Sequence, residues 1–477
     1  MRTLLLSLVL LAAASAVVRA ADPDANRGAA TIYGERYRPQ FHFSPRKNWT
    51  NDPNGLVFYR GEYHLFFQHN PTGINWGNMT WGHAVSPDLF HWTQLDNAIA
   101  PDKLGTIFSG SAVVDGNNTA GFQTGAEKVL VCIYTSAGGT SDESKGQPVT
   151  QSIAYSNDRG RSWTKYAKNP VLKNVAGSNR DPKVFWHAAT KQWIMALFLD
   201  GQSYALFGSP NLKEWKKICD VPPFGCGECP DMFELPVDGD VRNTRWVFWG
   251  GNSNYAIGTF DGRSFTKESG PWRFEFGGNY YAAQSYSDAP DGRRIQIAWM
   301  AGGRYPDMPF NQQMSLPSEL TLRKFAEGIR LCRQPVKELD ALHQKHQAWS
   351  GTVKAGDDPL QGIAGDLLDI RLELAPGDAV EAILTIGDAA VVFDAKRKTV
   401  SCLEKTAALE PIAGKIKLQV LVDRASIEVF GNDGKISLST CYLPPRQHKR
   451  VALTTKGGQA TVKSLDVWEL KSAWARP

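Results

Sequence analysis

A tight-turn motif recurs four times within the first three hundred residues of the chain. In each copy a Ser or Thr is followed two residues later by Asp or Asn, and then by an aromatic residue. These polar residues favour tight turns because their side chains hydrogen-bond to nearby backbone groups. The copies begin at Ser86, Ser156, Ser209 and Thr259, and they end at Trp92, Trp163, Trp215 and Phe265. Repeats of about 40–50 residues that contain several strands are typical of β-propeller blades.

Apolar runs between these turns form pairs that are predicted to be antiparallel strands. Residues 56–59 and 63–67 flank a turn that contains glycine, which is the pattern of a β-hairpin. Similar pairs are 111–114 with 129–134, 184–186 with 193–197, 232–235 with 245–249, and 281–287 with 294–300. We therefore predict a five-bladed β-propeller over residues 35–335, with four or six blades as the alternative counts.

The pattern changes after Pro335. A short helical turn is predicted at 336–342, and apolar residues then alternate with polar ones along 368–374 and again along 416–422. Such alternation is typical of half-buried antiparallel strands, and about 130 residues suit a β-sandwich. The predicted fold class is therefore all-β: the five-bladed propeller, a linker at 336–348, and a C-terminal β-sandwich at 349–477.

The N-terminus and the charge distribution indicate where the protein works. Residues 4–18 are apolar and precede Val18-Arg19-Ala20, so residues 1–20 are predicted to be a cleaved signal peptide. We expect a secreted or periplasmic protein that has no membrane association after cleavage. The formal net charge of +5 is spread along the chain without a basic run, which argues against a nucleic-acid partner.

Seven cysteines are too few, and odd in number, for a disulfide framework in a chain of this size. Cys226 and Cys229 have the spacing of redox and zinc sites, but no second pair supplies further ligands. We interpret them as a local disulfide or as two packed thiols beside Glu228, and we predict no metal and no cofactor.

Carboxylates open the apolar run in three of the predicted blades. Asp52 and Asp181 each precede a proline, and Glu228 stands two residues before Pro230. Proline is tolerated at the first residue of a strand, where its missing N–H spoils no ladder bond. Because the innermost strand of every blade lines a central channel, we expect Asp52, Asp181 and Glu228 to meet at one end of it.

Converging acids could bind a cation, but their surroundings favour a sugar. Neutral donors and flat aromatic faces stand near the acids in the sequence, as sugar recognition needs, and Arg180 beside Asp181 would oppose a bound cation. These neighbours are Asn51, Gln68, Trp76, Trp81, Phe108 and Trp299. The combination suggests a glycosidase.

These segments resemble glycoside hydrolase family 32, which includes invertases, inulinases and levanases. The resemblance rests on Trp49–Gly55, Phe67–Pro71, Trp76–His83, Phe108–Ser111, Arg180–Pro182 and Glu228–Pro230, and on Leu421–Phe430 in the second domain. The Trp76–His83 segment looks most like microbial levanases and fructan β-fructosidases.

The resemblance implies a role for each matching residue. Asp52 matches the nucleophile, Glu228 the acid/base, and Asp181 the transition-state stabiliser. The residues that match the pocket for the terminal fructose are Asn51, Gln68, Trp76, Phe108, Ser109, Arg180 and Trp299. The implied partner is a fructan or sucrose substrate, cleaved from its end by way of a covalent fructosyl-enzyme; the oligomeric state is not implied.

The physical chemistry of a retaining glycosidase adds one expectation. One carboxyl group has to be ionised and the other protonated. We expect burial and the nearby charge of Asp52 to raise the pKa of Glu228, giving a bell-shaped pH profile with a mildly acidic to neutral optimum.

Three other functions are alternatives to a fructan hydrolase. They are a fructosyltransferase of the same family, a related five-bladed enzyme acting on arabinan, and a catalytically inactive fructan-binding protein.

Overall fold

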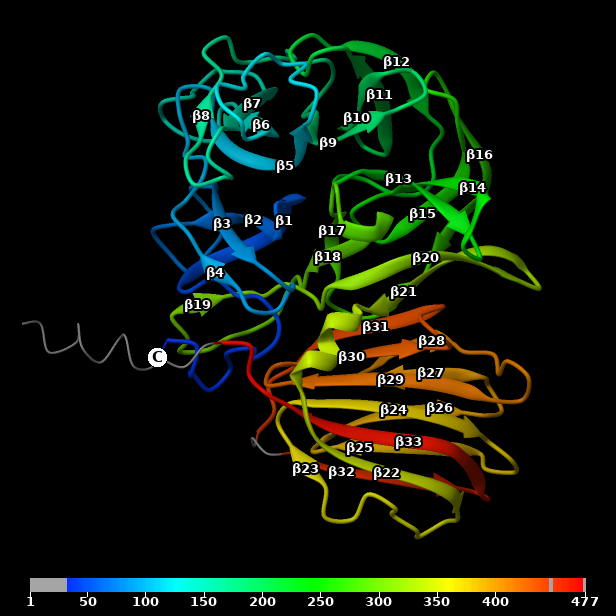
Figure 1. The fold of residues 1–477 in the computed structure, drawn as a ribbon. Coiled ribbons are helices and arrows are strands. Elements are labelled where there is room, and N and C mark those ends of the chain that lie inside the picture. Colours follow the sequence, from blue (N-terminus) through cyan, green and yellow to red (C-terminus); the bar gives the residue numbers. More distant parts are fainter. Residues whose placement is uncertain (1–31, 446–448, 475–477) are drawn as a thin grey trace, which may run out of the picture.

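The computed structural model describes residues 32–445 and 449–474, and most of them lie in or between β-strands. Figure 1 shows a ring of small sheets, coloured blue to yellow-green, beside two layered sheets coloured yellow to red. The predicted all-β fold, a five-bladed propeller followed by a β-sandwich, is confirmed. The predicted signal peptide lies outside the described residues. Within those residues no helix has the length and apolar character needed to cross a membrane.

Blades one to three each contain four consecutive antiparallel strands. The hairpin between the first two strands has left-handed backbone at Arg60 and Gly61, as a two-residue hairpin turn requires. The strands are β1 (Asn48–Tyr59), β2 (Glu62–Asn70), β3 (Thr80–Ser86) and β4 (Thr93–Gln94); β5 (Thr106–Asp115), β6 (Val129–Ala137), β7 (Thr150–Ser156) and β8 (Thr164–Lys165); and β9 (Arg180–His187), β10 (Gln192–Asp200), β11 (Ser203–Ser209) and β12 (Lys216–Val221).

Blades four and five are joined into one sheet, because β13 pairs in parallel with β20 at Val237 and Leu322. A short strand, β19, leaves the fifth blade and pairs in parallel with β1, so the last blade is tied to the first. The elements are β13 (Asp231–Val237), β14 (Asp240–Trp249), β15 (Asn254–Phe260) and β16 (Phe265–Arg273); and β17 (Tyr281–Ser285), the 3₁₀ helix η1 (Pro290–Gly292), β18 (Ile295–Trp299), β19 (Phe310–Asn311), β20 (Ser318–Phe325) and β21 (Gly328–Pro335).

The four turn motifs work as the sequence predicts. In each copy the Asp or Asn side chain accepts hydrogen bonds from backbone N–H groups two to four residues later. In two copies the indole N–H of the closing tryptophan, Trp163 or Trp215, then donates to a carbonyl of the same turn. Local side-chain bonds therefore fix the turns, and they do so independently of the packing between blades.

The β-sandwich consists of two six-stranded sheets that follow a 3₁₀ helix, η2 (Lys337–Leu342). The first sheet contains β22 (His343–Val353), β33 (Ala460–Leu470), β24 (Leu368–Ala375), β29 (Ile416–Asp423), β30 (Ser426–Gly431) and β31 (Ile436–Cys441). The second contains β23 (Ala364–Gly365), β32 (Lys449–Lys456), β25 (Glu381–Ile386), β26 (Ala389–Asp394), β27 (Thr399–Cys402) and β28 (Lys405–Ala408).

The start of the sandwich corrects one predicted boundary. We predicted a linker at 336–348, but β22 already begins at His343. Residues 343–348 are polar or small, so no alternation marks them as a strand. They are held by pairing with β33 and by the stacking of His343 and His346 on Trp468. A cross-strand contact of this kind joins residues far apart in the sequence.

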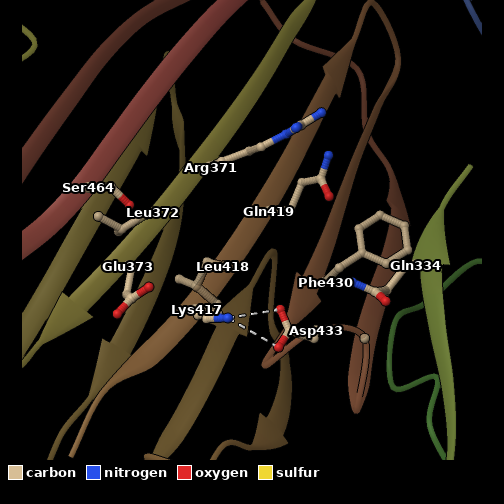
Figure 2. Close-up of a pocket in the computed structure, with 11 residues that line it drawn as sticks. Gln334, Arg371, Leu372, Glu373, Lys417, Leu418, Gln419, Phe430, Asp433 and Ser464 are labelled. Atoms are coloured by element: carbon tan, nitrogen blue, oxygen red, sulfur yellow. Dashed lines mark hydrogen bonds and ion pairs between the residues drawn. The ribbon is translucent and has the colours of Figure 1, made fainter. Parts of the chain in front are cut away.

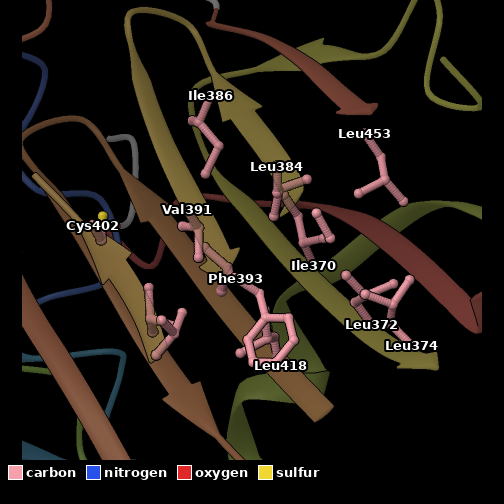
Figure 3. Close-up of a cluster of buried hydrophobic side chains, with 14 of the residues drawn as sticks. Ile370, Leu372, Leu374, Leu384, Ile386, Val391, Phe393, Cys402, Leu418 and Leu453 are labelled. Atoms are coloured by element: carbon pink, nitrogen blue, oxygen red, sulfur yellow. The ribbon is translucent and has the colours of Figure 1, made fainter. Parts of the chain in front are cut away.

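The core of the sandwich lies between its two sheets (Figure 3). Ile370, Leu372 and Leu374 alternate with more exposed residues along β24 and are buried. Leu384 of β25 and Phe393 of β26 belong to the same cluster from the second sheet. Burying the apolar side of each strand is favourable by about 25 cal/mol per Å², which explains the alternation seen in the sequence.

A buried network of charges joins the sandwich to the propeller. His42 Nδ1 lies 2.8 Å from Asp423 Oδ2, and its Nε2 lies 3.1 Å from Glu428 Oε2. On the other side Arg333 Nη2 lies 3.1 Å from Glu275 Oε2 and 3.6 Å from Glu428 Oε1. Burial alone would lower the pKa of His42, but its hydrogen bonds to both carboxylates raise it to about 9. The imidazole is therefore a cation that connects the domains.

Candidate active site

One small pocket, of about 200 Å³, receives side chains from all five blades. Most of the lining comes from the first strand of a blade, namely β1, β5, β9 and β17, and from the segment just before β13. Its lining residues are Asn51, Asp52, Gln68, Trp76, Phe108, Ser109, Arg180, Asp181, Glu228, Cys229, Tyr281 and Trp299. The three predicted acids and the seven residues predicted to bind the fructosyl unit are all among them. Trp81, which the sequence also suggested as a neighbour of the acids, is not, because it is buried behind Phe108 with its indole N–H on the Phe108 carbonyl.

Asp52 is held in a fixed orientation within β1. The Ser109 hydroxyl donates to its Oδ2 at 2.5 Å, and the Asn51 amide donates to its Oδ1 at 3.1 Å. The amide of Asn51 is oriented in turn by Trp49, whose indole N–H donates to Asn51 Oδ1 at 2.8 Å. Burial raises the pKa of Asp52, these donors lower it, and the net direction is upward. A carboxylate oriented in this way has little freedom to rotate away from a ligand.

Asp181 and Glu228 are linked through Arg180. The guanidinium donates from Nη2 to Glu228 Oε1 at 2.5 Å, and its Nε lies 3.7 Å from Asp181 Oδ2. Asp181 also accepts the backbone N–H of Cys229 at 3.1 Å. Burial raises the pKa of Asp181 to about 7; Arg180 works against the increase, and the charge of Asp52 adds to it.

The backbone is strained where these acids are presented. Asp181, Glu228 and Cys229 have positive φ angles of 63°, 58° and 40°, and Ala282, next to Tyr281, has 53°. Residues other than glycine adopt this region rarely, at a cost of order 1–3 kcal/mol each. Such strain is retained where the surrounding structure forces it, and it is common at sites that position functional groups.

Aromatic rings and one unpaired amide form the walls. Trp76 and Phe108 meet edge to face with ring centroids 6.0 Å apart, and Tyr281 and Trp299 meet similarly at 6.4 Å. Trp76 is 56% exposed, so its ring is available at the rim. The buried Nε2 of Gln68 has no hydrogen-bond partner within the described part of the chain. An unpaired buried donor is costly, and a hydroxyl group of a ligand would satisfy it.

Residues 42–335 match the N-terminal domain of glycosyl hydrolases family 32, and residues 338–469 match the C-terminal domain of the same family. The chain belongs to glycosyl hydrolase family 32. It is therefore a glycoside hydrolase, and the resemblance noted in the sequence is confirmed.

Family 32 relatives align over nearly the whole chain. A levanase of Bacillus subtilis is 42% identical, over 94% of this chain and 73% of the relative. An extracellular exo-inulinase of Aspergillus niger is 32% identical, over 93% of this chain and 96% of its own length. The crystal structure of exo-inulinase from Aspergillus awamori, at 31% identity, has a TM-score of 0.82 and covers 93% of this chain and 100% of that one. A fructofuranosidase from Schwanniomyces occidentalis complexed with fructose has a TM-score of 0.79 at 28% identity, covering 93% and 99%.

One expectation about this family 32 site is wrong. We expected the pKa of Glu228 to be raised, but the structure places it below its usual range. Burial does raise it, as anticipated. Hydrogen bonds from Tyr281 and Arg180 to the two carboxyl oxygens outweigh that effect, because donors stabilise the charged form.

Two lining residues of the family 32 pocket were not predicted as site residues. Tyr281 opens β17, the inner strand of the fifth blade, much as Asp181 stands at the start of β9. That shared register is the signal that could have identified it. Cys229 lies with its sulfur 3.6 Å from both Asp52 Oδ2 and Asp181 Oδ2. Of the two interpretations for Cys226 and Cys229, the structure has free thiols and no disulfide among the described residues.

Proposed function

We propose that this family 32 hydrolase releases terminal fructose units from β-fructosides such as levan, inulin and sucrose. The levanase and exo-inulinase relatives support this substrate class, as does the structural neighbour complexed with fructose. The pocket volume of about 200 Å³ suits a single sugar ring. A pocket of that size supports cleavage from the chain end over cleavage inside a polymer.

The observation that carries the proposal is the contrast between the donors of two acids in one pocket. Asp52 is oriented by Ser109 and Asn51, which leaves it suited to attack. Glu228 is bound by Arg180 and Tyr281, groups that can stabilise its carboxylate after it gives up a proton. A retaining glycosidase requires two carboxyl groups with such different tasks.

In the first proposed step an oxygen of Asp52 forms a bond to the anomeric carbon of the terminal fructosyl unit. The bond from that carbon to the leaving oxygen breaks, and protonated Glu228 transfers its proton to this oxygen. In the second step the Glu228 carboxylate takes a proton from water as the water oxygen attacks the same carbon. The bond to Asp52 then breaks and free fructose leaves.

Asp181 and Arg180 are proposed to bind the hydroxyl groups of the fructosyl unit. Hydroxyls that donate to Asp181 favour its charged form and lower the raised pKa that it has in the free pocket. A hydroxyl that accepts from Arg180 weakens the bond from Arg180 to Glu228. We infer that substrate binding thereby raises the pKa of Glu228, so that it holds the proton that the first step needs.

Product analysis tests the proposal. The protein is incubated separately with levan, inulin and sucrose, and Asp52→Asn is run beside it. Free fructose from the wild type alone supports exo-hydrolysis. Short oligomers would show endo-cleavage, products longer than the substrate would show transfer, and no product from any fructoside would overturn the proposal.

We also propose that the protein is secreted. The apolar segment at 4–18 has the features of a signal peptide, and Aspergillus relatives are named extracellular. N-terminal sequencing of the protein exported by its host tests this proposal, with a mature chain that begins after Ala20 as the expected result.

A further inference from the structure

A layer of buried polar side chains lies behind the pocket, on the inner strands of the propeller. Each member stands two positions after a residue that lines the pocket, and alternate residues of a strand point to the same side. The members are Asn54 after Asp52, Ser111 after Ser109, Lys183 after Asp181 and Asp231 after Cys229. All four are at most 1% exposed, so they are out of reach of a substrate. Any effect that they have on the pocket acts through other residues.

The members of this layer bond to the backbone of neighbouring inner strands. The strands β5, β9 and β17 are edge strands of their sheets, and the inner edge of such a strand presents backbone groups without ladder partners. Ser111 Oγ donates to the carbonyl of Pro182 at 2.9 Å. Lys183 Nζ donates to the Ser285 carbonyl at 2.5 Å, and Asp231 Oδ2 accepts the Ser285 N–H at 2.6 Å. Side-chain bonds of this kind connect the blades just behind the pocket.

Asn54 connects the first blade to the second. Its Nδ2 donates to the backbone carbonyl of Asp52 at 3.1 Å, and its Oδ1 accepts the backbone N–H of Gly110 at 3.1 Å. Gly110 directly follows Ser109, whose hydroxyl donates to the Asp52 carboxylate. One buried amide therefore links β1 to β5 beside the bond between Ser109 and Asp52.

β-Bulges explain why that link is needed. The pairing of β1 with β2 shifts in register around Asp52, and the pairing of β5 with β6 shifts around Ser109. A bulge redirects side chains and disrupts the local ladder. The two bulges also belong to different sheets, so ladder bonds do not hold them at a fixed separation. The Asn54 amide bonds to both backbones and supplies that constraint.

We propose that Asn54 is a positioning residue for the reaction, which holds the backbones of Asp52 and Ser109 at the separation that their side-chain bond requires. This inference rests on the proposed function, in which Asp52 attacks the anomeric carbon. A catalytic group that is displaced by 1 Å can lose about 10²-fold in rate. Both bonds of the Asn54 amide go to backbone, so its substitution leaves in place the other titratable and charged groups of the pocket, which are Arg180, Asp181, Glu228, Cys229 and Tyr281.

A double-mutant cycle tests this role. Asn54→Ala is made in the wild type and in Ser109→Ala, and kcat/KM for sucrose is measured across the pH range. We expect Asn54→Ala to lower kcat/KM about ten- to a hundredfold in the wild type. The loss should be no more than about threefold in Ser109→Ala, because the bond through which Asn54 acts is already missing there. Equal losses in the two backgrounds would overturn the proposal.

The pH profile gives a second readout from the same variants. The Ser109 donor favours the charged form of Asp52, so losing the bond raises the pKa of Asp52. The acidic limb of kcat/KM, which reports the base of the free enzyme, should therefore move to higher pH in Asn54→Ala and in Ser109→Ala. An acidic limb that moves in Ser109→Ala alone would also overturn the proposal.

Asn432→Ala, in the sandwich, is the matched control. Asn432 is also buried, and its amide also bonds to two backbone groups: Oδ1 accepts the N–H of Lys417 at 3.0 Å, and Nδ2 donates to the carbonyl of Glu410 at 2.8 Å. It precedes Asp433, whose ion pair with Lys417 is drawn in Figure 2. We expect this variant to lower the melting temperature, as Asn54→Ala does, and to keep the wild-type kcat/KM and pH profile. A shifted acidic limb in Asn432→Ala would overturn the proposal, because lost stability would then account for the effect.

Crystal structures of the variants separate this inference from the catalytic proposal. In Asn54→Ala the Ser109 hydroxyl should lie beyond hydrogen-bond distance of the Asp52 carboxylate. Asn54→Asp keeps the acceptor for the Gly110 N–H and should retain the bond. A bond that is unchanged in Asn54→Ala, or lost equally in Asn54→Asp, would overturn the positioning role. Failure of the wild type to release fructose would overturn the proposed function alone, since the structures need no catalysis.

Discussion

The Tyr281 hydroxyl donates a hydrogen bond to Oε2 of Glu228, across the boundary between the fifth and fourth blades. Arg180 binds the other carboxyl oxygen, so each oxygen of Glu228 has its own donor. The charged form of Glu228 is thereby favoured in the free pocket, although burial acts in the opposite direction. The protonation of the proposed acid is therefore controlled by its neighbours more than by its burial.

Removing the Tyr281 hydroxyl is expected to shift the pH profile of activity. Tyr281→Phe keeps the ring and removes the hydroxyl, so the pKa of Glu228 rises. The alkaline limb of kcat/KM, which reports the acid of the free enzyme, then moves to higher pH. We also expect kcat/KM at the optimum to fall roughly tenfold, in line with the loss of one hydrogen bond to a charged group. Tyr155→Phe, in which the ring stacked on Phe122 is kept, is the control and leaves the profile unchanged. An alkaline limb that stays in place would contradict the assigned role of Tyr281.

The sequence was sufficient to predict the architecture because its signals are local. Side chains such as Asp88 and Asn211 bond to backbone only a few residues away, so the turn motifs are visible without any knowledge of the fold. Asp52 and Asp181 could be placed together because each opens an apolar run at the same point of a repeat. Once the repeats are arranged in a ring, positions in register converge.

What the sequence did not predict depends on contacts between distant segments. Tyr281 meets Glu228 across 53 positions of the chain, and its place at the start of an inner strand does not by itself show that contact. The pKa of Glu228 was predicted with the wrong sign because burial can be inferred from composition, whereas the donors to a carboxylate cannot. The polar strand at 343–348 has the same explanation, because its pairing and stacking partners on β33 lie more than a hundred residues away.

Rescue by azide is expected to distinguish the two proposed catalytic acids. Glu228→Ala loses the general acid, which contributes about 10²–10⁴-fold to the rate. With an activated fructoside, this variant still forms the fructosyl-enzyme. Azide needs no general base, so it attacks that intermediate and gives β-fructosyl azide. Asp52→Ala lacks the nucleophile, and azide that replaces it gives the opposite anomer. The anomers are identified by NMR. Asn174→Ala, a loop variant outside the pocket, serves as the control and should form no azide product. The same anomer from both variants would contradict the assignment.

A matched pair of glycines tests how closely β5 and β6 must approach to place Ser109. A Cβ added at Gly110 would lie 2.0 Å from the backbone oxygen of Ile133, whereas one added at Gly116 would meet nothing within 4 Å. Gly110→Ala is expected to destabilise the fold by about 1–3 kcal/mol or more, since backbone must move. It should also lower activity, because Ser109 is the next residue and orients Asp52. Gly116→Ala should change stability by no more than about 0.5 kcal/mol. Thermal unfolding and kcat with sucrose measure both effects, and equal behaviour of the two variants would refute the argument.

The charge network between the domains predicts a pH-dependent stability. The pKa of His42 is raised from 6.5 to about 9, so the folded protein holds a proton that the unfolded chain releases between those values. The stabilisation is complete below pH 6.5 and is lost as the pH rises through about 9. His42→Asn leaves Asp423 buried without its cation and leaves Glu428 with Arg333 alone, which is expected to cost about 3–5 kcal/mol at acidic pH. The difference in the free energy of unfolding between His42→Asn and the wild type should narrow at about pH 10, where His42 itself is neutral.

His346→Asn, which removes an exposed partner of Asp466, provides the control and should cost no more than about 1 kcal/mol. Denaturant unfolding of the three proteins at the two pH values measures these differences, and a gap for His42→Asn that is independent of pH would show that His42 is not the charged link.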